Sequence, residues 1–152
     1  SLKSVQIQFS LLAPDLGKQY QVKKICDENN IDFFAYSPLS FGILCIDPDK
    51  EENKEKSFIR NSLFENYKKP TYELRRCLKR IAHQRSVSQA QVAINWCCYQ
   101  GTIPLVGMRK KSQVIDVSNV FNWNLKKNEF KVLQEVSKKC LKKMPKNPFS
   151  SN

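Results

Sequence analysis

Ile31-Asp32-Phe33-Phe34-Ala35, followed by Tyr36-Ser37-Pro38-Leu39, is the stretch that decides the fold of this chain. An apolar run breaks here into a loop. Short apolar runs flanked by helical patterns are typical of buried parallel strands in α/β folds. In such folds the binding sites collect at the carboxyl ends of the strands. Function is therefore to be sought in the loop that begins at Tyr36.

Two more strands are predicted around this stretch, at Val5 to Phe9 and at Ile103 to Val106. Between the first two strands, residues 18–29 carry apolar side chains at helical spacing, which predicts a helix with its inner face on Val22, Ile25 and Cys26. Strand, helix and strand together form a βαβ unit, which is right-handed by default. An α/β fold with a parallel sheet follows.

Four helices are predicted in the remainder of the chain. Their ranges are Thr71 to Gln84, Ser88 to Gly101, Ser112 to Phe121 and Asn128 to Lys142. The second opens on Ser88-Gln89-Ala90-Gln91, which has the spacing of a capping box, and closes at a glycine. Asp47 to Lys56 is rich in both charges and lacks a packing face, so it predicts a mobile surface loop within a lid-like segment at about residues 45–70.

The composition indicates one domain with a strong positive charge. The chain has 152 residues, of which 41% are hydrophobic, enough for a sizeable core. Lys and Arg total 26 against 14 acidic residues, giving a net charge of +12. This balance favours anionic partners and leaves nucleic acid, a membrane surface or a phosphorylated cofactor open. The concentration of lysines between Lys126 and Lys146 has its simplest interpretation as a solvated helix face.

The six cysteines predict reduced thiols rather than disulfides or a metal site. They show no regular spacing and no CxxC pair, and His83 is the only histidine, so a zinc site of ordinary spacing is not expected. No signal peptide, transit sequence or membrane-spanning apolar run is recognisable. We therefore expect a cytoplasmic protein without a membrane partner.

Four motifs in order resemble the second half of an aldo-keto reductase. They are Gln6-Ile7-Gln8-Phe9-Ser10-Leu11-Leu12, then Phe34-Ala35-Tyr36-Ser37-Pro38-Leu39 with Gly42-Ile43-Leu44, then Gln89-Ala90-Gln91-Val92-Ala93-Ile94-Asn95-Trp96, and Ile103-Pro104-Leu105-Val106-Gly107. The resemblance runs from about Val5 to Phe149, and the tail from Met144 to Phe149 is most similar to the plant-type branch of that family.

The resemblance implies α/β architecture as a partial (β/α)8 TIM barrel. A complete barrel has about 250 residues, so residues 1–152 would form the last three βα units plus a C-terminal helix, with the N-terminal half absent. The chain begins with Ser, and we expect a truncated product. In the family the proton-donating Tyr and its Asp, Lys and His partners come from the first four strands. No catalytic residue is therefore assigned within this chain.

The resemblance also implies a cofactor cradle at the strand ends. The residue matching Gln6 holds the nicotinamide carboxamide in the family, and Tyr36 would stack on the nicotinamide ring. Ser37, Leu39 and Gly42 would allow close approach of a pyrophosphate through a hydroxyl, backbone N–H groups and a missing Cβ. Without the family, the alternatives are a buried Gln bonded to backbone and a tyrosine at the rim.

The loop after the last strand would hold the adenosine end of that cofactor. Gly107 opens the loop, and the family residues matching Arg109, Gln113 and Asp116 bind there, with Arg109 placed to meet a 2′-phosphate. This implies NADPH rather than NADH. The family's Asn after the acidic residue is Val117 here, so one adenine contact is lost. An ordinary solvated loop is the alternative for Arg109.

Three functions remain open at this stage. The first is the cofactor-binding portion of an NADPH-dependent oxidoreductase that reduces aldehydes or ketones, with the isolated chain inactive. The second is a non-catalytic regulatory or assembly subunit of the same fold, which would self-associate through exposed strand edges. Nucleic-acid binding is a distant third, since it rests on charge alone.

Overall fold

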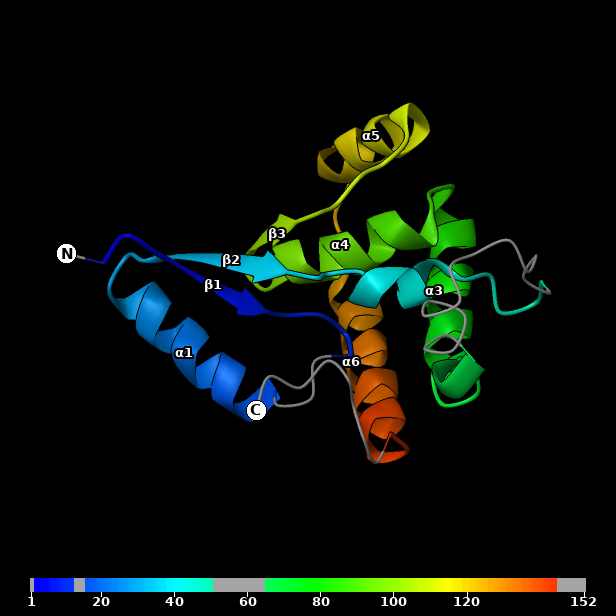
Figure 1. The fold of residues 1–152 in the computed structure, drawn as a ribbon, viewed down its shortest axis with the longest axis horizontal. Helices are drawn as coiled ribbons and strands as arrows, with labels where there is room; N and C mark the ends of the chain where they lie inside the picture. The colour runs from blue at the N-terminus through cyan, green and yellow to red at the C-terminus, as the bar shows by residue number, and fades with distance from the viewer. Residues whose placement is uncertain (1, 13–15, 51–64, 145–152) are drawn as a thin grey trace.

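The computed structural model describes residues 2–12, 16–50 and 65–144 (Figure 1). Statements about structure below concern these residues. The elements are β1 (Ser4–Gln8), α1 (Leu16–Glu28), β2 (Asp32–Tyr36), the 3-10 helix η1 (Ser40–Cys45), α3 (Tyr72–Arg85), α4 (Gln89–Tyr99), β3 (Ile103–Leu105), α5 (Lys111–Ser118), the 3-10 helix η2 (Asn119–Asn122) and α6 (Lys127–Lys142).

The three strands form one parallel sheet in the order β1-β2-β3. Side chains alternate between the two faces of a strand. On one face, Phe33 and Ala35 are buried in the core, which includes residues of α1, α3, α4 and α6. On the other face, Gln6 is exposed, and Ile103 and Leu105 keep 43% and 39% of their surface accessible. The sheet is therefore covered by helices on one face only.

An aromatic cluster joins the sheet to the helices. Phe9, directly after β1, stacks on Trp96 of α4 with ring centroids 5.3 Å apart and meets Phe33 edge-on at 5.6 Å. Trp96 continues the stack to Phe130 of α6. Phe9 and Trp96 are fully buried. Large aromatic rings contribute strongly to core stability, and these fix α4 and α6 relative to the carboxyl end of β1.

Most of the predicted elements are confirmed within two residues of their bounds. α3 and α6 bury apolar residues at helical spacing, with Phe130 and Val136 partly buried: Leu74, Leu78, Ile81, Ala82, Leu133 and Cys140. The predicted helix over residues 112–121 is instead α5, ending at Ser118, followed by a turn of 3-10 helix.

The inward position predicted for Ile25 is wrong. Its side chain is 55% exposed, whereas Cys26 is 2% exposed. Successive residues point about 100° apart around a helix, so the narrow face of α1 that touches the sheet accommodates Cys26 and leaves Ile25 outside. Spacing alone indicated an apolar stripe wider than the contact that the helix makes.

The six cysteines, all in the described ranges, form no disulfide with one another in the structure. Burial raises the pKa of Cys140 to about 11 and raises that of Cys97 further. Both thiols therefore stay protonated and act as small apolar groups. Within the described ranges, no cluster of side chains is suited to hold a metal ion, and no helix has the length and apolar character needed to cross a membrane.

Candidate functional site

The loop after β2 adopts a left-handed backbone at several positions. Ser37, Ser40 and Phe41 have φ of 53°, 49° and 56°, and Gly42 has φ of 92°. Residues with a Cβ seldom adopt positive φ, and runs of them concentrate at functional sites. The Ser40 hydroxyl lies 2.9 Å from that of Ser10, which follows β1. The loops at the carboxyl ends of β1 and β2 are thus held together.

The loop after β3 is closed by a side chain of the helix that follows it. The side-chain oxygen of Gln113, Oε1, accepts hydrogen bonds from the backbone N–H groups of Arg109, at 2.8 Å, and Lys110, at 3.0 Å. The side chains of Arg109 and Lys110 are exposed at the start of α5. Exposed cations beside the positive end of a helix dipole favour an anion.

Asp116 of α5 is bonded to the first turn of α4. The Ser88 hydroxyl donates to its Oδ2 at 2.6 Å, and the Gln91 side-chain amide donates to its Oδ1 at 2.7 Å. Ser88 also accepts from the backbone N–H of Gln91, which confirms the predicted helix cap. The reciprocal half of that capping box is not formed, because the Gln91 amide is used by Asp116 and its carbonyl accepts from the indole N–H of Trp123.

These segments surround a hollow of about 280 Å³. Four of the sequence-predicted site residues line it: Leu39, Gly107, Gln113 and Asp116. A Cβ added at Gly107 would meet nothing within 4 Å, so the backbone there borders open space. The hollow is small for a whole dinucleotide, since ligand pockets commonly measure about 300–1,000 Å³, but it fits one portion of such a molecule.

The remaining predicted residues do not line this hollow. Gln6 and Tyr36 occupy neighbouring strands on the open face of the sheet, where the register pairs Gln6 with Phe34 and Tyr36 with Gln8. Ser37 and Gly42 are partly buried in the left-handed loop, and Arg109 is exposed. The strand ends thus present two zones, a sheet face with Gln6 and Tyr36 and the hollow beside α5.

Sequence reasoning missed several residues of the hollow. Ser88, Gln89 and Ala90 at the start of α4 line it, together with Cys45, Val106, Met108 and Val117. Ser88 and Gln89 were noted only for helix capping and family resemblance. A capping motif at a strand-proximal helix start could have indicated them, because helix N-termini attract anionic groups. The other positions carry no local signal.

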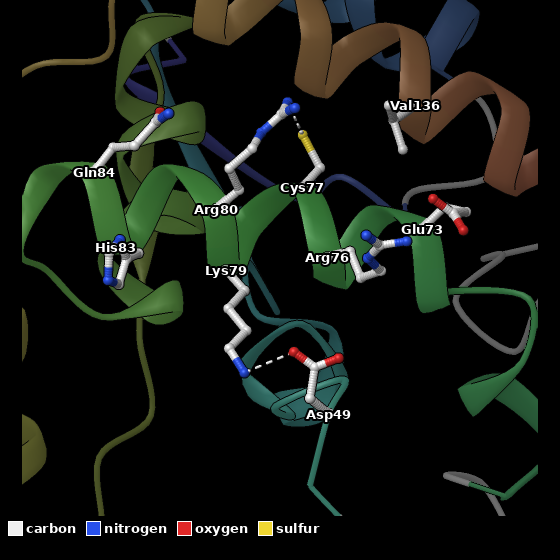
Figure 2. Close-up of a pocket in the computed structure, with 9 residues that line it drawn as sticks. All are labelled: Asp49, Glu73, Arg76, Cys77, Lys79, Arg80, His83, Gln84 and Val136. Carbon is white, nitrogen blue, oxygen red and sulfur yellow. Dashed lines mark hydrogen bonds and ion pairs between the residues drawn. The ribbon is translucent and has the colours of Figure 1, made fainter.

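A second hollow, of about 580 Å³, lies along α3 and contains none of the predicted residues (Figure 2). Lys79 projects from α3 and pairs with Asp47 at 2.6 Å and Asp49 at 2.9 Å. Lys79 lowers the pKa of Asp47, and the two carboxylates raise that of Lys79. The described start of the predicted lid is therefore tied to α3, while residues 51–64 of it lie outside the described part. We assign the candidate site to the smaller hollow because four predicted residues converge there.

The chain is similar in sequence to known proteins of one enzyme family. The aldo/keto reductase family model matches residues 1–138. The chain belongs to this family. Among curated proteins, this aldo/keto reductase chain is 36% identical over 151 residues to the chloroplastic pyridoxal reductase of Arabidopsis thaliana, a match covering 99% of the chain and 40% of that relative. It is also 29% identical over 119 residues to an uncharacterized oxidoreductase of Schizosaccharomyces pombe, covering 78% of the chain and 31% of the relative.

Solved structures place the fold among aldo-keto reductase (β/α)8 barrels. The glycerol dehydrogenase AKR11B4 of Gluconobacter oxydans superposes with a TM-score of 0.67 at 22% identity, covering 98% of this chain and 44% of that one. A mutant of Gox0644 in complex with NADPH gives a TM-score of 0.61 at 16% identity, covering 88% and 38%. The chain spans about two fifths of the length of such relatives, and its three parallel βα units confirm a partial barrel.

Proposed function

We propose that this chain is the cofactor-binding portion of an NADPH-dependent reductase acting on aldehydes or ketones. One observation carries the proposal. The hollow brings Leu39, Gly107, Gln113 and Asp116 together beside the exposed cations of Arg109 and Lys110. Residues from two loops and the helix α5, far apart in the sequence, thereby converge on a space bordered by positive charge.

The residues present fit a phosphorylated dinucleotide. Arg109 offers a planar, permanently charged group that suits a phosphate. Gln6 can both donate to and accept from a carboxamide, and Tyr36 beside it offers an aromatic face. NADPH, when bound, supplies the hydride for reduction of a carbonyl carbon.

In that reaction the residues of this chain would bind and orient the cofactor. Gln6 and Tyr36 would hold the nicotinamide end on the open sheet face, while Arg109 would hold the 2′-phosphate at α5. By the family resemblance, the acid that must protonate the reduced carbonyl oxygen is a Tyr of the first four strands, which residues 1–152 are not expected to include. We therefore propose that the isolated chain binds cofactor without turning over substrate.

We also propose two partners for this chain, a small-molecule substrate and a second copy of itself. The carbonyl substrate is a small molecule, and a second copy of the chain is a candidate partner because β1 and β3 are sheet edges and one sheet face is open. Nucleic acid is disfavoured, since the exposed cations of α6 are not interleaved with exposed aromatic rings. The cytoplasmic location stays a prediction.

Calorimetric titration of the chain with NADPH and NADH tests the proposal. The wild type should prefer NADPH by about 10–100-fold, the value of one hydrogen-bonded charge pair. Arg109→Gln should lose most of this preference by weakening NADPH alone. Lys139→Gln, which removes an exposed charge from α6, is the matched control and should leave both affinities unchanged. Equal affinities in the wild type, or an unchanged preference in Arg109→Gln, would contradict the assignment.

A further inference from the structure

Asp116 is engaged inside the protein on both of its carboxylate oxygens. Each oxygen accepts one short hydrogen bond from the first turn of α4, from Ser88 and from Gln91. Gln91 is 5% exposed, and its carbonyl is already bonded to the Trp123 indole. A buried amide needs an acceptor, so turning Asp116 toward a ligand would leave the Gln91 N–H groups without one.

Gln113 is engaged in the same way. Its side-chain oxygen accepts hydrogen bonds from two backbone N–H groups, and these bonds shape the turn from Arg109 into α5. The next position that could offer an acceptor to an adenine amino group is Val117, which has an apolar side chain. The acceptors that α5 supplies to the hollow thus already hold hydrogen bonds that fold the protein, and a bond to a ligand would have to share the same oxygens.

α5 depends on these bonds because it has little apolar packing. None of its residues is buried, and Val114 and Ile115 are 49% and 56% exposed. Figure 1 shows α5 standing apart from the layer formed by the sheet and α4. An element with few buried apolar contacts opens locally at low free-energy cost. The hydrogen bonds that Asp116 accepts from Ser88 and Gln91 are therefore a main attachment of this helix to α4.

We propose that Asp116 is a positioning residue that fastens α5 to α4. In this proposal the site recognises its dinucleotide through phosphate and makes no hydrogen bond to the adenine amino group. The second half rests on the proposed NADPH function. Arg109 and Lys110, carried on the turn that α5 holds in place, supply the contact to phosphate. The base then lies in the hollow through shape and apolar contact with Leu39 and Met108.

The first test measures the attachment directly by amide hydrogen exchange. Asp116→Ala should lower the protection of the α5 amides by about 10-fold or more, the loss expected for about two hydrogen bonds. Val117→Ala, at the adjacent position, is the control and should change it by no more than about 3-fold. Equal protection in Asp116→Ala and wild type would overturn the tether, and this test does not require a cofactor.

The second test compares NADPH with its hypoxanthine analogue, in which a carbonyl replaces the adenine amino group. The wild type should bind both within about 3-fold, and Asp116→Ala should weaken both by one common factor. A wild-type preference for NADPH of about 10-fold or more, abolished by Asp116→Ala, would make Asp116 a base-reading residue and overturn the inference while leaving the proposed function intact. Failure to bind either dinucleotide would overturn the proposed function and the statement about the base, and the exchange experiment would still decide the tether.

Discussion

Substituting Glu129 by Gln should destabilise the chain measurably through the joint between α3 and α6. Glu129 accepts from Nε of Arg85 at 2.9 Å and from its Nη2 at 2.8 Å, a two-pronged pair. It also accepts from the backbone N–H of Lys126 at 2.7 Å, at the start of α6. The side chains of Arg85 and Glu129 are 24% and 12% exposed, so the pair is screened less than a surface ion pair.

The expected loss in free energy of unfolding is about 2 kcal/mol. A hydrogen bond to a charged group that is shielded from water contributes about 1.5–3 kcal/mol to the free energy of unfolding. An exposed ion pair contributes less than about 1 kcal/mol. Gln keeps the shape and one acceptor oxygen, so only part of the interaction is removed. For a chain of 152 residues, 1 kcal/mol corresponds to about 2–4 °C in melting temperature. The variant should therefore melt about 4–8 °C lower.

The difference should depend on pH. Burial acts to raise the pKa of Glu129, but Arg85 and the Lys126 N–H outweigh it and hold the pKa below the ordinary value of 4.5. A carboxylate with a lowered pKa contributes stability that is complete above its unfolded pKa and is lost as the pH falls through its folded pKa. Protonated Glu129 resembles Gln, so the stability gap between wild type and variant should be full at neutral pH. The gap should shrink as the pH falls below 4.5 and close once the pH is below the lowered pKa of Glu129.

Thermal unfolding followed by circular dichroism from pH 3 to 8 measures both effects. Glu135→Gln is the matched control, since Glu135 lies on the exposed side of α6, and it should shift melting by less than about 1 °C. A melting difference for Glu129→Gln that is absent at pH 7, or that persists unchanged at acid pH, would refute the reasoning.

Two further predictions concern surface and thiols. Sedimentation velocity should reveal association that increases with concentration, because the sheet is open on one face and at both edges; a monomer at all concentrations up to about 100 μM would contradict this. In a thiol-labelling time course at neutral pH, exposed Cys45 should react first, while Cys97 and Cys140, buried and with raised pKa values, should react only upon unfolding; early labelling of Cys97 would show that α4 opens.

The strands and inner helix faces could be predicted because their signal is local. Apolar residues recur at the spacing of the element that carries them, as at Leu74, Leu78 and Ile81. The loop after β2 was also found, since the turn residues Ser37 and Pro38 interrupt an apolar run. Family resemblance added what no local pattern contains, namely the convergence of this loop with the one that begins at Gly107.

The hydrogen-bond partners of the site could not be predicted. Ser88 and Asp116 are 28 positions apart, and Lys79 and Asp47 are 32 apart. Which polar groups meet depends on how α4, α5 and η1 pack, and single-sequence periodicity carries no information on that packing. Asp116 was predicted at the cofactor site, and the structure places it in the wall of the hollow. Its bonds to Ser88 and Gln91 had no signal in the sequence.

The left-handed loop after β2 has a consequence for the kinetics of binding. Ser37, Ser40 and Phe41 hold a backbone conformation that would be sparsely populated in a free peptide. Folding has already selected it, and the Ser10–Ser40 contact maintains it. A molecule that binds here as proposed would meet a backbone already in its final conformation, so little conformational entropy would remain to be lost. Its association should then be limited by diffusion and charge steering rather than by rearrangement of the loop.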